Sequence, residues 1–101
     1  MYVILWEFEI EAGHEEQFQS CYSPAGDWAR LFSQSPGYLG TELLQSCENP
    51  TRYLTIDRWS DQDAYNEFLR THREAYHALD ARCEKLTRAE RSLGHFVLPA
   101  A

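Results

Sequence analysis

An imidazole and two phenols share the apolar side of the longest helical pattern in this chain. Between positions 61 and 86, hydrophobic residues recur at helical spacing, and at about 100° per residue they fall in one narrow sector. The residues of this sector are Tyr65, Phe68, Leu69, His72, Tyr76, Leu79, Cys83 and Leu86. The pattern therefore predicts that His72, Tyr65 and Tyr76 bring ionisable groups to a buried surface, where such groups can handle protons.

Two interpretations of His72 are open. In the first, the imidazole is a hydrogen-bonded core residue and the tyrosines only pack around it. In the second, a pocket lies between this helix and a β-sheet, and His72 transfers protons there because imidazole titrates near neutral pH.

The composition is that of one globular domain over positions 1–101 with an acidic balance. Hydrophobic residues make up 44% of the 101 residues, and 16 acidic against 9 basic residues give a net charge of −7. No Lys/Arg cluster interrupts this charge, so we expect no binding to nucleic acid and none to an anionic membrane. The N-terminus lacks the basic start of a signal peptide, and the odd number of cysteines, 3, favours reduced thiols in the cytoplasm.

Alternating hydrophobic residues predict the strands. The predicted ranges are 2–10, 38–46, 52–59 and 91–98. In the second range, alternation places Leu39 and Leu43 on the face opposite Tyr38 and Leu44.

Helical periodicity predicts helices over 14–22, just after position 27, and over 61–86. Asp27 is the expected N-cap of the second helix. Ser60 is the expected N-cap of the third, with Asp63 in the capping-box position. Because the third pattern is long for one globular helix, it can kink near Thr71 and His72.

The element order β-α-β-β-α-β predicts an α+β fold of the split βαβ type, with an antiparallel four-stranded sheet and helices on one face. The residues that face the other side of the sheet are also apolar. They include Val3, Leu5, Leu54, Ile56 and leucines of the second strand. A patch of this size is normally covered, so we expect a two-fold homodimer through the open sheet face. The alternative is a monomer in which Glu7 and Arg58 keep this face hydrated.

Three segments carry a resemblance to a known family. They are 36–44 (PGYLGTELL), 52–60 (RYLTIDRWS), and Ala64-Tyr65 with Phe68 and His72. On these residues the chain resembles the antibiotic biosynthesis monooxygenase (ABM) family of the dimeric α+β barrel superfamily, over nearly its whole length. The resemblance implies a ferredoxin-like protomer, two sheets that close a barrel, and one pocket per protomer between sheet and helices.

The resemblance also implies a reaction. Characterised members oxidise electron-rich aromatics such as phenols and hydroquinones with O2, using no metal or flavin, so no cofactor is expected. A buried base removes the phenolic proton, and a dry pocket holds the radical pair. His72 is the expected base, and Tyr65 and Tyr76 are expected to orient or stabilise the oxyanion. The expected flat walls for a small aromatic ligand are Trp6, Trp28, Phe68 and Trp59.

Core packing is the alternative for each of these aromatic residues. It is the better interpretation for Trp59, which directly precedes the expected Ser60 cap, whereas for Trp6 and Trp28 the two interpretations are balanced.

Two other chemistries are disfavoured. Haem-degrading members of the superfamily require an asparagine, a tryptophan and a histidine where this chain has Trp6, Phe68 and Ala78, with His77 beside the last position. In addition, His72 and His77 lie about 140° apart around a helix, so they cannot share a metal ion.

Two function classes therefore stay open. One is a cofactor-independent monooxygenase that acts on a phenolic or quinol-type aromatic. The other is a non-catalytic small-molecule-binding or stress-associated dimer of the same fold. A ferredoxin-like regulatory domain is a more remote option.

Overall fold

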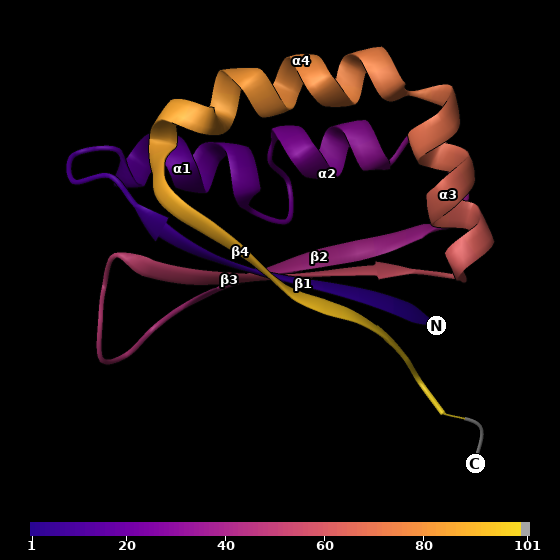
Figure 1. The fold of residues 1–101 in the computed structure, drawn as a ribbon, viewed down its shortest axis with the longest axis horizontal. Coiled ribbons are helices and arrows are strands. Elements are labelled where there is room, and N and C mark those ends of the chain that lie inside the picture. The colour runs from indigo at the N-terminus through magenta and orange to yellow at the C-terminus, as the bar shows by residue number, and fades with distance from the viewer. Residues whose placement is uncertain (100–101) are drawn as a thin grey trace.

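A four-stranded antiparallel sheet forms the centre of the computed structural model, which describes residues 1–99 (Figure 1). The strands are β1 (Tyr2–Ile10), β2 (Tyr38–Gln45), β3 (Arg52–Trp59) and β4 (Thr87–Val97). They pair in the order β2-β3-β1-β4. The helices lie on one face of this sheet and are α1 (Glu15–Tyr22), α2 (Asp27–Phe32), α3 (Gln62–Thr71), α4 (Arg73–Cys83) and the 3₁₀ turn η1 (Glu84–Leu86). This confirms the predicted α+β, ferredoxin-like fold.

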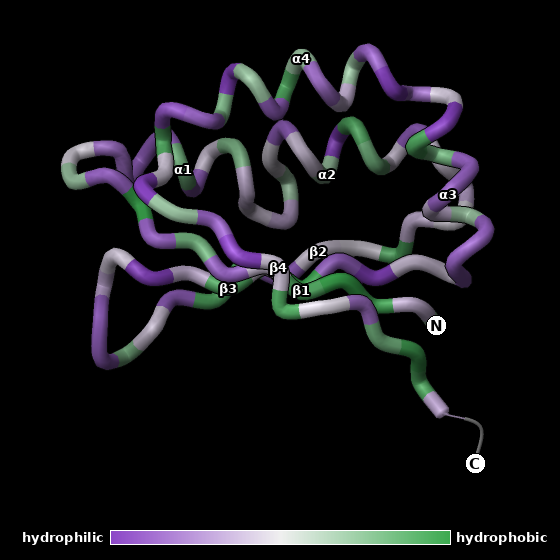
Figure 2. The backbone as a smooth tube through the Cα atoms, in the orientation of Figure 1, coloured by the Kyte–Doolittle hydropathy of each residue, from purple (hydrophilic) through white to green (hydrophobic). Residues whose placement is uncertain are grey.

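The core lies between the helices and the inner face of the sheet. In β1, Ile4, Phe8 and Ile10 are buried there, while the intervening Val3 and Leu5 stay partly exposed on the other face. Figure 2 shows this change of hydropathy from residue to residue along the strands. The predicted ranges of β1 and β3 agree with the structure because alternation of this kind is a strong strand signal.

The prediction for β4 was wrong at its start. The strand begins at Thr87 rather than at position 91. Its first residues are polar and mostly exposed, so hydrophobicity does not reveal them, but they pair with the end of β1 from Phe8 to Ile10.

The predicted face assignment in β2 was also wrong. The register shifts between Tyr38 and Gly40, where Leu39 is an extra residue opposite β3. Tyr38 packs on Trp59, with ring centroids 5.3 Å apart, as its predicted face requires. The bulge reverses the alternation after it, so Leu43 packs against the core and Leu44 lies on the open face, 44% exposed.

Two helix caps differ from prediction by one residue. The N-cap of α3 is Asp61, whose Oδ1 accepts a hydrogen bond from the Ala64 N–H at 2.8 Å, rather than Ser60. Ser60 instead donates its backbone N–H to the Gly37 carbonyl at 2.7 Å, which ties the end of β3 to the start of β2. The N-cap of α2 is Gly26, and Asp27 is the first helical residue.

The long helical pattern is divided at His72, where the sequence allowed a kink. His72 has φ −119° and ψ 28°, which is outside the helical region, and it is both the C-cap of α3 and the N-cap of α4. Figure 1 shows α3 and α4 running in clearly different directions from this point. The residues after His72 therefore lie around a different axis from those before it.

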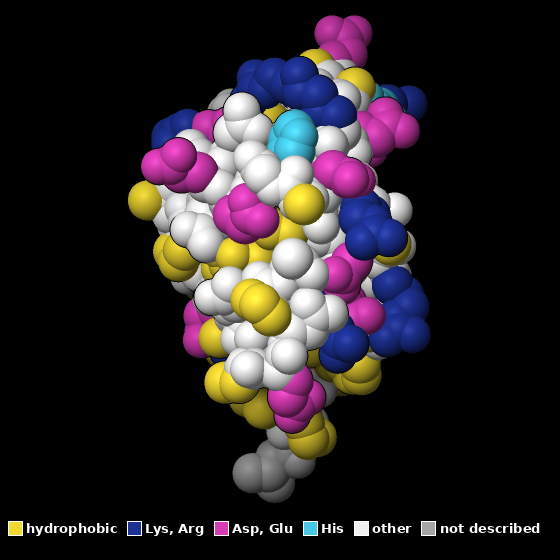
Figure 3. Space-filling model, turned by 90° about the vertical axis from the view of Figure 1, so that its left-hand side faces the viewer, with side chains coloured by type: hydrophobic (Ala, Val, Ile, Leu, Met, Phe, Trp, Pro, Cys, Tyr) yellow, Lys and Arg dark blue, Asp and Glu magenta, His cyan; other side chains and the backbone are white. Residues whose placement is uncertain are grey.

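The open face of the sheet carries apolar side chains and two ion pairs. Phe96 is 51% exposed, and Leu54 and Ile56 are partly exposed. Arg58 pairs with Glu42, and Arg91 pairs with Glu7 at 3.0 Å. At the end of the molecule that carries the β2–β3 connection, acidic and basic side chains are interspersed with hydrophobic ones (Figure 3). Among residues 1–99, no helix has the length and apolar character needed to span a membrane.

Candidate functional site

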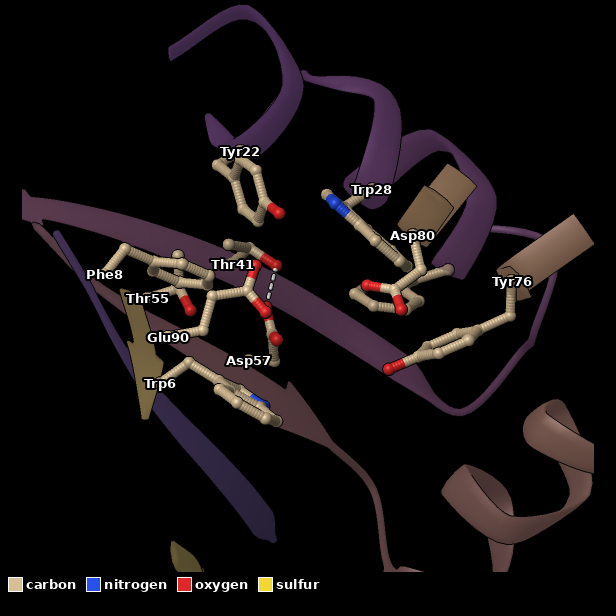
Figure 4. Close-up of a pocket in the computed structure, with 11 residues that line it drawn as sticks. Trp6, Phe8, Tyr22, Trp28, Thr41, Thr55, Asp57, Tyr76, Asp80 and Glu90 are labelled. Atoms are coloured by element: carbon tan, nitrogen blue, oxygen red, sulfur yellow. Dashed lines mark hydrogen bonds between the residues drawn. The ribbon is translucent and has the colours of Figure 1, made fainter. Parts of the chain in front are cut away.

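A cavity of about 160 Å³ lies between the helices and the inner face of the sheet (Figure 4). All strands and three of the helices contribute to its wall, so residues far apart in the sequence meet there. The lining residues are Trp6, Phe8, Tyr22, Trp28, Phe32, Thr41, Thr55, Asp57, Tyr76, Asp80 and Glu90.

Aromatic rings form much of this wall. The rings of Trp6 and Phe8 are stacked with centroids 6.3 Å apart on the floor formed by β1. On the helical side, Trp28 of α2 meets Tyr76 of α4 edge to face at 5.1 Å. Burial raises the pKa of the Tyr76 hydroxyl, which therefore stays protonated at neutral pH. The cavity thus offers flat apolar surfaces with a phenolic hydroxyl beside them.

Asp57 is a partly buried carboxylate on the inner side of β3. Thr41, its cross-strand partner in β2, donates a hydrogen bond from Oγ1 to Asp57 Oδ1 at 2.6 Å. Because the Thr41 hydrogen is used in this bond, the Tyr38 hydroxyl, 2.5 Å from Thr41 Oγ1, must be the donor in its own contact. The chain of bonds therefore runs from Tyr38 through Thr41 to Asp57 and holds the carboxylate in place.

The environment of Asp57 changes its acidity. Burial raises the pKa of this carboxyl group to about 6, and the Thr41 hydrogen bond opposes that rise. A carboxylate with a pKa near neutrality can accept a proton from a ligand and release it again at physiological pH.

Two further carboxylates, Asp80 and Glu90, line the same cavity from α4 and β4. Burial raises the pKa of Glu90, and the negative charge of Asp80 adds to the rise. No Lys, Arg or His side chain belongs to the lining among the described residues.

The structure brings only some of the predicted site residues to this cavity. Trp6, Trp28 and Tyr76 line it. Phe68 and Trp59 are 1% and 0% exposed and pack against each other, with ring centroids 5.4 Å apart, in the core. For Trp59 this matches the packing interpretation.

Tyr65 and His72 lie outside the cavity lining. Tyr65 packs edge to face on Trp59 at 5.3 Å. It also lines a second, more open pocket of about 480 Å³ between α3 and α4, which it shares with Tyr76. The His72 ring stacks on Phe68 with centroids 4.9 Å apart, and its Nδ1 is 2.9 Å from Thr71 Oγ1. The break in the helix at His72 is the reason that its side chain no longer points with those of α4.

Sequence reasoning missed the three carboxylates. A signal for Asp57 existed, because alternation in β3 places it on the same face as the buried Tyr53 and Trp59. A weaker signal existed for Asp80, four residues after Tyr76 and therefore on the same side of α4. Glu90 had none, since it lies in the part of β4 that the pattern did not reveal.

Comparison with known proteins identifies the family of this chain. The family model described as antibiotic biosynthesis monooxygenase (ABM) matches residues 1–82. A search of curated proteins found no match.

Solved structures share the fold. A variant of SnoaB, a cofactor-independent oxygenase from Streptomyces nogalater, has a TM-score of 0.81 at 19% identity, over 99% of this chain and 94% of that chain. An antibiotic biosynthesis monooxygenase structure from Deinococcus radiodurans has a TM-score of 0.79 at 14% identity, over 100% and 95% of the two chains. One from Bordetella bronchiseptica has a TM-score of 0.73 at 16% identity, over 98% and 97%.

These TM-scores show a common fold, while the family model covers most of the sequence itself. The chain therefore belongs to the antibiotic biosynthesis monooxygenase family.

Proposed function

We propose that this protein is a cofactor-independent monooxygenase that oxidises a small phenolic aromatic with O2 in the cavity between sheet and helices. The observation that carries the proposal is Asp57, a carboxylate with a pKa of about 6 at the wall of an aromatic cavity. Family membership and the SnoaB-like fold support the same reaction class. We assign the role of base to Asp57 rather than to His72, because Asp57 lines the cavity and His72 does not.

The proposed chemistry balances without an added reductant. Asp57 takes the proton of the phenol, and the phenolate passes one electron to O2. The phenoxyl radical and superoxide combine at a ring carbon that carries hydrogen, which forms a C–O bond, and the peroxide takes up the proton held by Asp57. The ring C–H proton then leaves as the O–O bond breaks and water departs. The products are one quinone and one water, and the phenol supplies all the electrons.

The test uses ¹⁸O2 and a panel of phenols with an unsubstituted para position. Wild type should form a quinone that contains one ¹⁸O atom, which autoxidation of a hydroquinone does not give. We expect Asp57→Asn to lower the rate by about a hundredfold or more, because the base is lost. His72→Ala and the surface variant Asp63→Asn should stay within about twofold of wild type, since neither residue lines the cavity.

Other outcomes are equally informative. A large loss in His72→Ala with an active Asp57→Asn would make His72 the base, as the sequence pattern predicted. Phenol binding without any quinone would identify a non-catalytic small-molecule-binding protein of the same fold.

The wild-type kcat/KM should also fall as the pH drops below about 6, where Asp57 becomes protonated.

We also propose a homodimer through the open sheet face. Val3, Leu5, Leu54 and Ile56 are partly exposed there, and Leu44 and Phe96 are 44% and 51% exposed. A second copy of the same face is the simplest cover for such a patch, because it is self-complementary under two-fold symmetry. The cytoplasmic location expected from the odd number of cysteines remains a prediction.

A further inference from the structure

The charge of the cavity is not balanced by the protein. Asp57, Asp80 and Glu90 all line it, and no basic side chain does among residues 1–99. Asp57 accepts a hydrogen bond from Thr41, and Glu90 has only a 3.4 Å contact from Thr87 Oγ1. None of the ion pairs within the described residues involves these three carboxylates. Asp57 is partly buried in the wall, whereas Asp80 and Glu90 are exposed. Carboxylates that line one cavity without a cation attract a ligand that brings positive charge.

The aromatic walls suit an organic cation. An ammonium group is attracted to the face of Trp or Tyr, and Trp6, Trp28 and Tyr76 all contribute to this wall. The described residues contain no group of three or more acidic, His or Cys side chains arranged to hold a metal ion. An ammonium group between carboxylates and aromatic rings therefore fits the cavity better than a metal ion does.

A second, independent observation concerns Trp28. Its side chain is only 8% exposed, and its Nε1–H has no hydrogen-bond partner among the described residues. Figure 4 shows this nitrogen at the edge of the indole that faces the Tyr22 side of the cavity. A buried donor without a partner costs free energy, so a ligand oxygen that accepts this hydrogen would be held specifically.

We propose that the ligand of this cavity is an aminophenol-type molecule, an aromatic ring with a phenolic oxygen and a separate ammonium group. The phenolic oxygen lies within reach of the Trp28 N–H, and the ammonium group lies between Asp80 and Glu90. The oxidation of this ligand rests on the function proposed above, but its binding does not. A phenolate formed beside three carboxylates is repelled by them, and an ammonium group on the same molecule offsets that repulsion.

The binding test uses four ligands of nearly equal size. Tyramine has both groups, 4-ethylphenol lacks the ammonium, 2-phenylethylamine lacks the phenol, and 4-hydroxyphenylacetate replaces the ammonium by a carboxylate. Isothermal titration calorimetry at pH 7.5 without turnover gives each Kd. We expect tyramine to bind about tenfold more tightly than 4-ethylphenol, and 4-hydroxyphenylacetate to bind most weakly.

Variants locate the two halves of the site. Asp80→Asn should remove most of the preference for tyramine over 4-ethylphenol, whereas Asp63→Asn, which changes the net charge equally on the exposed surface of α3, should not. Trp28→Phe should reduce the preference for tyramine over 2-phenylethylamine, because it removes the N–H but keeps an aromatic ring. Circular dichroism of each variant checks that the fold is retained.

The outcomes separate this inference from the proposed reaction. Equal Kd values for tyramine and 4-ethylphenol, or an Asp80→Asn variant with unchanged selectivity in a folded protein, would overturn the inference. Selective binding of tyramine, together with no ¹⁸O-labelled quinone from any phenol of the panel with a free para position, would support the inference and contradict the monooxygenase proposal. Quinone formation from neutral phenols, with no preference for binding a ligand that carries an ammonium group, would support the monooxygenase proposal and contradict the inference.

Discussion

The burial of Asp57 lowers the stability of the folded protein and also raises the pKa of this carboxyl group toward neutrality. It occupies a position in β3 whose inward neighbours, Tyr53 and Trp59, are buried and aromatic. Burial disfavours the charged form of a carboxyl group, and this raises the pKa of Asp57 from its ordinary value of 3.8 to about 6. The residue that we propose as the base therefore also makes the folded protein less stable when it is ionised.

The pH dependence of stability follows from this shift. Because the folded protein binds the Asp57 proton more tightly than the unfolded chain does, the penalty is absent below pH 3.8 and fully present above about pH 6. We expect Asp57→Asn to raise the free energy of unfolding at pH 7.5 by on the order of 2 kcal/mol, and the difference from wild type to vanish near pH 4. Urea unfolding at several pH values checks this, and a difference that does not change with pH would contradict it.

The break at His72 decides how the helices cover the sheet. α3 brings Phe68 against Trp59, and α4 then leads to Tyr76 at the wall of the cavity. One straight helix over the whole range would keep Phe68, His72 and Tyr76 on one side of a single axis. The two helices instead close different parts of the core. Of α3 and α4, only α4 contributes side chains to the cavity.

The start of α3 gives a direct test of the cap. Asp61→Ala removes the bond from the Asp61 carboxylate to the Ala64 N–H, so we expect a loss of about 1 kcal/mol in the free energy of unfolding. Ser60→Ala should cost clearly less, because Ser60 acts through its backbone N–H, which the variant keeps. Chemical denaturation of both variants distinguishes the caps, and an equal or larger loss in Ser60→Ala would show that Ser60 has the capping role.

For the whole molecule, the two faces of the sheet have different roles. The inner face holds the cavity and the core, and the outer face presents an apolar surface crossed by the Arg58–Glu42 and Arg91–Glu7 pairs. If a second copy covers this surface, the dimer stiffens the same strands that carry Asp57 and Trp6 on their other side. The dimer interface and the cavity would then lie on opposite faces of the same sheet.

The assembly prediction can be tested with one charge. Ile56 lies opposite Leu5 in the register of β3 and β1, near the centre of the open face. Light scattering should give about twice the 11.8 kDa mass of one chain for wild type, and Ile56→Lys should shift the mass to that of the monomer, because a buried unpaired charge opposes association. Ala78→Lys, on the exposed surface of α4 on the other side of the sheet, is the control and should remain dimeric. A wild-type protein that is monomeric at micromolar concentration would contradict the prediction.

Much of the fold follows from local patterns. Alternation in β1 and β3 predicts both strands with their observed bounds, and helical spacing predicts α1 and α3 with α4 to within about a turn. The segments 36–44 and 52–60, together with residues of the helix that follows, indicated the family, which the family model confirms. Strands and helices are determined largely by residues close together in the sequence, and the periodicity of hydrophobic residues indicates which side of each element is buried.

The site required the tertiary structure. The helical sector that drew attention to His72 assumed one axis across a segment that breaks at that residue. The carboxylates of Asp57, Asp80 and Glu90 come from β3, α4 and β4, and only the folding of these elements around one space brings them together. Periodicity indicates which face a side chain is on, but not which side chains of other elements it meets there. The burial of a carboxylate such as Asp57, and the rise in pKa that this burial causes, are therefore properties of the packed molecule.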